Sequence, residues 1–413
     1  MLSNVIHFTV RSIQPFGRKV LWNVGGGSYS GDNGIFRSSV PCFSNFEAPD
    51  RMLPWLLYPF REIIPGISVF RYITFRAAMA AAFAFVLSLI LGPFVIRTLR
   101  RLNMGQPIRE EGPQNHKDKA GTPTMGGILI LLVTTLSTLL WCDLRSIPIW
   151  VALVSLLGFG AVGAVDDTKK LLKKKNEGLR SWQKMAWLTA ISLVVAFMIH
   201  DFGLRGTLTS QLSVPFFKNF QPDVGYFLLP WIAFVMVGTS NAVNLTDGLD
   251  GLAIGGTLIV AVTFGILAYV AGNVKIASYL VVPYVAGGAD LSIFMSAMAG
   301  ACLGFLWFNA HPAEIFMGDT GALGLGGALA TTALIIKQEL LLAIAGGLFV
   351  IEAVSVILQI SSFKLRDGKR IFRMAPFHHH MELGGLHENK VVIRLWITAV
   401  VCSVLALASL KLR

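Results

Sequence analysis

Residues 148–175 read PIWVALVSLLGFGAVGAVDDTKKLLKKK, an apolar run that ends in two aspartates and a group of lysines. Residues 148–165 carry no charged side chain, and about 17–25 mostly apolar residues are enough for a helix to cross a bilayer. An aspartate at the centre of such a helix costs about 2.5–3.5 kcal/mol on insertion scales. The aspartate pair beside this run therefore predicts a function as well as a membrane helix.

Runs of the same kind recur along the chain. Of its 413 residues, 54% are hydrophobic and 14% are charged, whereas soluble domains carry about 25% charged residues. We expect an all-α, polytopic integral membrane protein with about ten transmembrane helices. The candidate spans are residues 77–96, 123–141, 148–165, 185–201, 225–243, 252–271, 291–309, 320–337, 340–360 and 391–410.

The basic residues predict the orientation of these spans. The net charge is +12, and the lysines and arginines are concentrated in short segments between apolar runs, so we interpret them as topology signals and not as a nucleic-acid surface. Such segments follow the first and third spans and precede the last one. Because positive loops stay in the cytoplasm, both termini are expected outside, in the periplasm. The four cysteines are far apart and form no CxxC, which predicts neither a zinc site nor a disulfide framework.

Three acidic segments lie at ends of these spans: the pair Asp166 and Asp167, residues 241–251 (NAVNLTDGLDG) and residues 316–321 (FMGDTG). The expected topology places all three on the cytoplasmic side, together with residues 112–127 and the histidine run 378–380. An active site built between helices requires separate loops that converge on one face. We therefore expect the active site at the cytoplasmic ends of the helices.

Each acidic segment also has a structural interpretation. Asp166 and Asp167 alone are compatible with a solvated helix end, although adjacent carboxylates repel and a cation most easily offsets that cost. Residues 241–251 are compatible with a glycine-rich turn, and Asp319 with an N-cap of the next helix, which does not exclude metal binding. Residues 241–251 nevertheless carry four polar side chains at steps of three, which would share one face of a helix: Asn241, Asn244, Asp247 and Asp250.

The ligand atoms of these segments favour Mg²⁺, because carboxylate and amide oxygens suit a hard cation that is shared with substrate phosphates. The three histidines are adjacent on an expected loop, where their side chains would diverge, and they follow Arg370 and Arg373. A cationic phosphate pocket is thus favoured over a metal-binding tract. Lys119 fits the same pocket as a point charge, although a basic loop beside a membrane helix usually signals lipid headgroups.

Five segments carry a family resemblance: GTPTMGG (121–127), VDD (165–167), NAVNLTDGLDGLA (241–253), FMGDTG (316–321) and MAPFHHHMEL (374–383). They resemble the phospho-N-acetylmuramoyl-pentapeptide transferases, the MraY family, from about Phe70 to Arg413. The aspartate-rich elements are shared with the wider superfamily of polyprenyl-phosphate N-acetylhexosamine-1-phosphate transferases. The triple-histidine segment separates the muramoyl-pentapeptide branch.

The resemblance implies an enzyme that transfers phospho-MurNAc-pentapeptide from UDP-MurNAc-pentapeptide to undecaprenyl phosphate, yielding lipid I and UMP with Mg²⁺ in peptidoglycan synthesis. It implies a homodimer in the bacterial inner membrane. Asp319 is then the principal Mg²⁺ ligand, with Asn241 as a second ligand. Asp166 deprotonates or positions the lipid phosphate, assisted by Asp167. A one-step transfer and a route through a phospho-aspartate both remain open.

The resemblance also assigns substrate contacts. Asp247 is implied to read the uracil, and Phe316 to stack on it. The further residues implied around the nucleotide, diphosphate or sugar are Lys119, Thr124, Asn241, Asn244, Asp250, Asn309, Gln359, His378, His379 and His380.

Residues 1–50 form an extension before the family's expected N-terminus near Met52. Residues 1–31 lack Asp and Glu but contain arginine, lysine and serine, which is typical of an organellar transit peptide. A transit peptide would place the protein in an organellar membrane, which therefore stays an alternative. A misassigned start codon and a disordered extension are explanations of at least equal weight. Residues 51–76 are expected to form an interfacial aromatic segment, and residues 77–413 the ten-helix transferase domain.

Three other functions are alternatives: a secondary transporter, a membrane scaffold and a related transferase. A secondary transporter also carries charged residues and glycine-broken helices, but here the acids lie at loop junctions on one face and the chain shows no internal repeat. A membrane scaffold without catalytic function does not require carboxylates at such costly positions. Within the enzymes, the alternative is a relative that transfers GlcNAc-1-phosphate to a polyprenyl phosphate.

Overall fold

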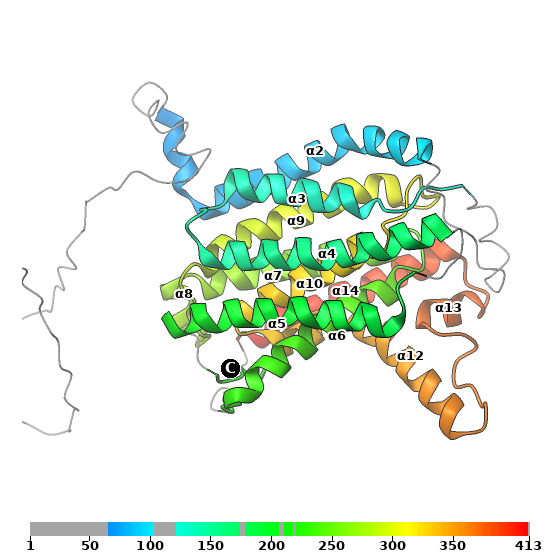
Figure 1. The fold of residues 1–413 in the computed structure, drawn as a ribbon. Coiled ribbons are helices and arrows are strands. Elements are labelled where there is room, and N and C mark those ends of the chain that lie inside the picture. Colours follow the sequence, from blue (N-terminus) through cyan, green and yellow to red (C-terminus); the bar gives the residue numbers. More distant parts are fainter. Residues whose placement is uncertain (1–64, 103–120, 174–177, 206–209, 218–219, 412–413) are drawn as a thin grey trace, which may run out of the picture. The chain divides into compact units, whose positions relative to one another are not determined.

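The computed structural model describes residues 65–102, 121–173, 178–205, 210–217 and 220–411 (Figure 1). Within these ranges the regular elements are helices, and the only β-structure consists of isolated bridges such as that between Gln211 and Asp223. The prediction of an all-α polytopic membrane protein is confirmed. The predicted extension 1–50 and most of the predicted interfacial segment lie outside the described residues.

Eight helices in the described ranges are long and apolar enough to cross a membrane. They are α2 (Ile73–Arg101), α4 (Ile147–Lys173), α5 (Ser181–Arg205), α6 (Leu228–Thr246), α7 (Leu252–Ala271), α9 (Gly288–Asn309), α12 (Gly347–Leu365) and α14 (Glu388–Ser409). The two remaining predicted spans are also helices: α3 (Gly127–Trp141) is apolar but shorter, and α10 (Gly318–Ile335) does not meet the same criterion. The total of ten spans stays a prediction.

Helix α10 lies at the centre of the bundle, packed against α4, α6, α3 and α7. Its side chains from Thr320 to Ile335 are all buried, and many are glycine, alanine or threonine. Small residues let neighbouring backbones approach closely. At Gly163 of α4, for instance, an added Cβ would overlap the carbonyl oxygen of Asp319. This close approach brings the aspartates of α4 and α10 together.

Several predicted boundaries were wrong. Helix α4 continues past the predicted end at residue 165 to Lys173, so Asp166 and Asp167 lie within the helix. The predicted span 340–360 is interrupted at Gly346, between α11 (Glu339–Ala345) and α12. Glycine is a poor helix former, and a side chain at the following Gly347 would collide with Cys402 of α14. A 3-10 helix, η2 (Pro65–Arg71), precedes α2, which begins at Ile73 instead of residue 77.

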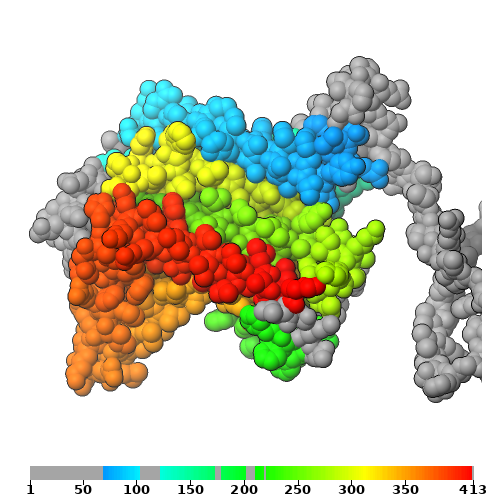
Figure 2. Space-filling view, turned by 180° about the vertical axis from the view of Figure 1, so that it is seen from behind, coloured from blue at the N-terminus to red at the C-terminus, as the bar shows by residue number. Residues whose placement is uncertain are grey.

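The helices pack in a sequence of neighbours that differs from their order in the chain. Helix α2 lies on α9, α9 on α7 and α7 on α14, and Figure 2 shows these four following one another from blue through yellow and green to red. The short elements are η4 (Gly225–Phe227), α8 (Val274–Leu280) and α13 (Phe377–Glu382). Figure 1 places α8 and α13 at opposite ends of the helical bundle, with the C-terminal end of α4 on the side of α13.

The turn between α6 and α7 is held by its own apolar cluster. Leu249 and Leu252 are buried against Leu348 of α12 and against Val391 and Leu395 of α14. This cluster fixes the turn, which contains Asp247 and Asp250, to the end of the bundle that carries α13. The acidic segments of α4, of the α6–α7 turn and of the start of α10 therefore meet at one end, as the sequence predicted.

Candidate active site

The centre of the site consists of three carboxylates from two helices. Asp166 and Asp167 belong to α4, and Asp319 belongs to the first turn of α10. One carboxylate oxygen from each lies within 4.8 Å of the others. Asp166 and Asp167 are only 3% and 4% exposed, so their charges are largely removed from water. Such a group requires compensation by cations or hydrogen-bond donors.

Asp167 caps the N-terminus of α10. Its Oδ2 accepts from the backbone N–H of Thr320 at 2.9 Å and from the Thr320 hydroxyl at 2.7 Å, and its Oδ1 accepts from the N–H of Asp319 at 3.2 Å. Carboxylates are stabilised at helix N-termini by free N–H groups and by the helix dipole. The sequence suggested Asp319 as a cap; the structure assigns the capping contacts to Asp167, so Asp319 keeps its carboxylate for other partners.

Two lysines compensate the three carboxylates. Lys170 Nζ lies 2.7 Å from Asp166 Oδ2, 3.0 Å from Asp319 Oδ2 and 3.9 Å from Asp167 Oδ1. Lys184 Nζ lies 2.7 Å from the same Oδ2 of Asp319. The ammonium group of Lys170 therefore lies among the carboxylate oxygens of all three aspartates, an arrangement that attracts cations. Both lysines were interpreted from the sequence only as topology signals.

Asparagine side chains complete one side of this group. With its amide nitrogen turned toward the carboxylate, Asn244 donates to Asp319 Oδ1 at 3.0 Å and accepts from Lys184 Nζ at 3.1 Å. Asn241 instead donates to the carbonyl oxygen of Val237 on its own helix at 2.8 Å. Its predicted role as a metal ligand stays a prediction.

The four polar residues of 241–251 do not share a helix face, because only part of this segment is helical. Asn241 and Asn244 lie on α6, Asp247 is its C-cap residue, and Asp250 lies in the turn before α7. Burial raises the pKa of Asp247 to about 8, supported by the nearby charges of Asp319 and Asp167 and opposed by the N–H of Gly318. Asp247 therefore faces the carboxylate centre from a second direction.

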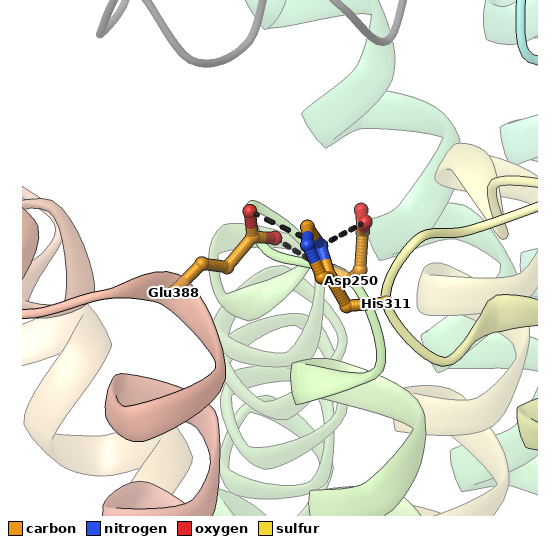
Figure 3. Close-up of side chains that lie close together, drawn as sticks. All are labelled: Asp250, His311 and Glu388. Carbon is orange, nitrogen blue, oxygen red and sulfur yellow. Dashed lines mark hydrogen bonds and ion pairs between the residues drawn. The ribbon is translucent and has the colours of Figure 1, made fainter.

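A second cluster lies beside the first, where Asp250, His311 and Glu388 converge from three separate segments (Figure 3). His311 Nδ1 lies 3.1 Å from Asp250 Oδ2 and 3.6 Å from Glu388 Oε2. Glu388 also accepts from the N–H of Asp250 at 3.0 Å. Glu388 opens α14, so this cluster connects the α6–α7 turn to the segment before α10 and to the C-terminal helix.

Asn309 and Phe316 hold the same segments by hydrogen bonds. Asn309 accepts from the N–H of Gly251 at 3.1 Å and donates to the carbonyl oxygen of Ile315 at 2.8 Å. The backbone of Phe316 bonds to Pro123 and to Gly126, each at 2.8 Å. Thr124, which is buried, lies on this paired segment beside Gly318. Of the predicted substrate residues, Thr124 and Phe316 are therefore brought beside the start of α10, and Asn309 lies between the α6–α7 turn and the segment before α10.

The histidine run forms the short helix α13 and not the loop that was predicted. The expected divergence is wrong for two of the three side chains: the rings of His378 and His379 lie with their centroids 4.2 Å apart, although each histidine has its own hydrogen-bond partner. His378 Nδ1 lies 3.0 Å from Glu352 Oε2, His379 Nδ1 lies 2.9 Å from Glu382 Oε2, and His380 accepts from the N–H of Arg373 at 3.2 Å. Gln359 accepts from two backbone N–H groups and donates to one carbonyl of residues 371–372, which anchors the segment that leads into α13.

Lys119 lies outside the described residues. Five residues that the structure places in or beside the site were not predicted from the sequence as site residues: Lys170, Lys184, His311, Glu352 and Glu388. Two of them had a signal. Lys170 stands four residues after Asp166, the spacing of a helical ion pair, and Glu352 is an acidic residue inside an apolar span. The other three are recognisable only from contacts between distant segments.

Comparisons with known proteins agree with this geometry. Residues 149–337 match the model of glycosyl transferase family 4, and residues 119–131 match signature 1 of the phospho-N-acetylmuramoyl-pentapeptide-transferases. A phospho-N-acetylmuramoyl-pentapeptide-transferase of Desulfotalea psychrophila is 54% identical over 358 residues, which cover 87% of this chain and 99% of that protein. Proteins with the same name from Citrifermentans bemidjiense and Oleidesulfovibrio alaskensis are 49% and 50% identical over 362 residues, 88% of this chain and all of each relative.

These relatives match nearly their whole length, and the family-model match at residues 149–337 contains the carboxylate centre. The protein is therefore a membrane transferase whose family acts in peptidoglycan synthesis. The chain belongs to the phospho-N-acetylmuramoyl-pentapeptide transferase family.

Proposed function

We propose that this protein transfers phospho-MurNAc-pentapeptide from UDP-MurNAc-pentapeptide to undecaprenyl phosphate. An oxygen of the lipid phosphate forms a bond to the sugar-linked phosphorus of the donor, the bond from that phosphorus to the bridging oxygen breaks, and UMP leaves with the bridging oxygen. The lipid product is lipid I. The observation that carries this proposal is the partly buried Asp319 carboxylate, held by Lys170, Lys184 and Asn244 beside Asp166 and Asp167.

The residues present fit Mg²⁺. The three aspartates offer oxygen ligands within reach of one cation, and the ammonium group of Lys170 already lies among them. Asp319 is the proposed principal ligand, with Asn241 as the proposed second ligand. Bound Mg²⁺ would neutralise charge on the donor diphosphate, which is the main requirement of phosphoryl transfer.

The protein's own groups would do the rest by positioning. Lys170 and Lys184 supply positive charge where donor and acceptor phosphates meet, and Asp166 aligns the lipid phosphate, an already competent nucleophile when fully ionised. Asp167 holds the first turn of α10 and so the direction of Asp319. We propose direct transfer, and a route through a phospho-aspartate is the alternative.

Donor recognition is proposed for the side of the site formed by the α6–α7 turn, the segment before α10 and α13. Asp247 would read the uracil and Phe316 would stack on it. Thr124, Asn244, Asp250, Asn309 and Gln359 would line or fix this side, and His378, His379 and His380 would serve the phosphate and sugar. Lys119 is proposed as an additional phosphate contact.

The proposal also includes the membrane in which the protein lies, the orientation of its active site and its oligomeric state. The basic segments 97–101, 169–173, 178–184 and 364–373 belong to the end of the bundle that carries the site, so we propose that this end faces the cytoplasm, where UDP-sugars are made. The proposed membrane is the bacterial inner membrane, and the proposed assembly is a homodimer.

One assay tests substrate class and metal together. Purified protein in detergent is given undecaprenyl phosphate with UDP-MurNAc-pentapeptide and UDP-GlcNAc side by side, with Mg²⁺ present or chelated. We expect lipid-linked product from the muramoyl donor only, and loss of the product after chelation. Product from UDP-GlcNAc would identify the GlcNAc-1-phosphate transferase alternative. Uptake of labelled nucleotide sugar into vesicles without a lipid-linked product would identify a transporter.

A further inference from the structure

Helix α12 carries a buried carboxylate within its apolar span. Glu352 is 0% exposed, and the surrounding helix is one of the eight that can cross a membrane. An ionisable side chain at such a position is costly and usually serves a function, with a specific partner. The partner of Glu352 is His378 of α13.

Glu352 binds His378 through a single oxygen. Its Oε2 accepts from the backbone N–H of His378 at 3.3 Å and lies 3.0 Å from the ring Nδ1. Because Oε2 already accepts from the backbone N–H of His378, we assign the ring contact to an Nδ1–H that donates to the same oxygen. The orientation of the imidazole and its tautomer are thus both set by Glu352, in the way that carboxylates orient catalytic and metal-binding histidines.

The opposite edge of the imidazole points to the α6–α7 turn. His378 Nε2 is buried and has no hydrogen-bond partner in the described part of the chain. It faces Gly248, where an added Cβ would overlap it. Gly248 directly follows Asp247, so a polar nitrogen with a free hydrogen-bonding position is held against the turn that approaches the carboxylate centre.

We propose that Glu352 is a positioning residue for the transfer reaction: it holds the Nδ1–H of His378 and thereby presents Nε2 to the donor at the α6–α7 turn. This inference rests on the proposed function, because it assigns Glu352 a role in that same site. A purely structural tie between α12 and α13 would need only the contact between Glu352 and His378. If Glu352 is a positioning residue, the effect of its replacement on kcat also depends on the presence of His378 Nε2.

A double-mutant cycle separates these two roles. Glu352→Gln keeps the shape but removes the charge that selects the Nδ1–H tautomer. His378→Asn keeps a polar group near the Nδ1 position but removes Nε2. The variants and the double variant are prepared as the full chain in detergent, and kcat and the donor KM are measured with UDP-MurNAc-pentapeptide and undecaprenyl phosphate.

We expect Glu352→Gln to lower kcat by about 10- to 100-fold, the usual effect of removing a group that orients a functional histidine, with a small change in donor KM. In the His378→Asn background, Glu352→Gln should lower kcat by less than about 2-fold, because the nitrogen that Glu352 positions is already absent. An equal loss of kcat in both backgrounds would overturn the proposal. So would a Glu352→Gln variant with the kcat of the wild type.

Two further variants guard against loss of folding. Glu352→Asp keeps the negative charge but is one methylene shorter, so it should also lower kcat; full activity would overturn the proposal even if Glu352→Gln cannot be purified. Glu339→Gln is the matched control, since Glu339 is another buried glutamate, at the start of α11 beyond the far end of α10. It should leave kcat unchanged. If it lowers kcat as much as Glu352→Gln, the loss reflects removal of a buried charge and the proposal fails.

The wild-type reaction distinguishes a failure of this inference from a failure of the proposed function. A wild-type protein that forms no lipid-linked product from this donor refutes the proposed function and, with it, the role of Glu352. A wild-type protein that does form the product, combined with an additive cycle, refutes the positioning role alone.

Discussion

At the scale of single residues, Asp319 is the carboxylate of the site that both lysines bind. Lys170 and Lys184 both bind its Oδ2, and Asn244 binds its Oδ1. These contacts come from α4, α5 and α6, and they favour the ionised form of a carboxylate that is otherwise removed from water. Its side chain is thus held ready to bind a cation.

Replacing Asp319 by Asn should lower kcat by at least about 100-fold, because a preorganised charge is lost where the diphosphate charge changes. It should also raise the Mg²⁺ concentration that is needed for the remaining activity. Both quantities follow from initial rates over a Mg²⁺ titration. Asp223→Asn, at an exposed carboxylate beside η4, is the control and should behave as the wild type. An unchanged Mg²⁺ dependence in Asp319→Asn would contradict the assignment.

Asp247 should act mainly on donor binding. A carboxylate that accepts a hydrogen bond from uracil contributes equally to ground and transition states, so Asp247→Ala should raise the donor KM. Leaving a buried hydrogen-bonding group without its partner costs about 1–3 kcal/mol, which corresponds to a loss of about 5- to 150-fold in kcat/KM. Uridine-containing inhibitors should lose affinity in parallel. If kcat is abolished while KM and inhibitor binding are unchanged, Asp247 belongs with the catalytic carboxylates.

At the scale of elements, the first turn of α10 is fixed by a side chain from another helix. Asp167 of α4 binds the N–H of Asp319 and both the N–H and the hydroxyl of Thr320. The direction of the Asp319 side chain therefore depends on the packing of α4 against α10, which the glycine at position 163 permits.

Asp167→Ala should lower both the melting temperature and kcat. The loss of an N-cap contact costs about 0.5–2 kcal/mol of stability, and the free N–H groups would no longer define the first turn. Thr320→Val is the matched control, since it removes one donor but leaves both backbone contacts, and its effects should be smaller. Melting is followed by thermal denaturation in detergent, beside activity. A larger loss in Thr320→Val than in Asp167→Ala would argue against the capping role.

The cluster of Asp250, His311 and Glu388 connects three elements across the donor side (Figure 3). We expect His311→Ala to raise the donor KM by about 10-fold, because the α6–α7 turn loses a hydrogen-bonded connection to the segment before α10. The Mg²⁺ requirement should stay that of the wild type. His200→Ala, on α5, serves as the control. An effect of His311→Ala on Mg²⁺ dependence without a change in KM would place His311 with the metal-binding group instead.

At the scale of the whole molecule, segments far apart in the sequence meet at one end of the helical bundle, and the basic residues predict that this end is cytoplasmic. In a variant without native cysteines, a cysteine at Arg366 should react with an impermeant thiol reagent only after the cells are opened. A cysteine at Lys275, on α8 at the other end, should react from outside. Labelling with the opposite pattern would place the site on the side that lacks the UDP-sugar.

Much of the fold and of the site could be predicted from the sequence. Apolar runs of sufficient length predict membrane helices because the cost of unsatisfied backbone groups in hydrocarbon leaves few alternatives. The acidic segments at the ends of these runs identified Asp166, Asp167 and Asp319, which the structure brings within 4.8 Å. Helix boundaries were less accurate, because polar residues such as those of α4 up to Lys173 extend a helix beyond the apolar run.

The sequence by itself determined the class of the protein, the order of its apolar helices along the chain and the identity of the carboxylate centre, since these depend on local hydrophobicity and on short motifs. Only the tertiary structure decided that Asp167 caps α10, that Lys184 binds Asp319 and that Glu352 holds His378. These contacts join residues that are separated by 153, 135 and 26 positions in the chain. No local pattern encodes such pairs, because they arise from the packing of helices whose neighbours in space are not their neighbours in sequence.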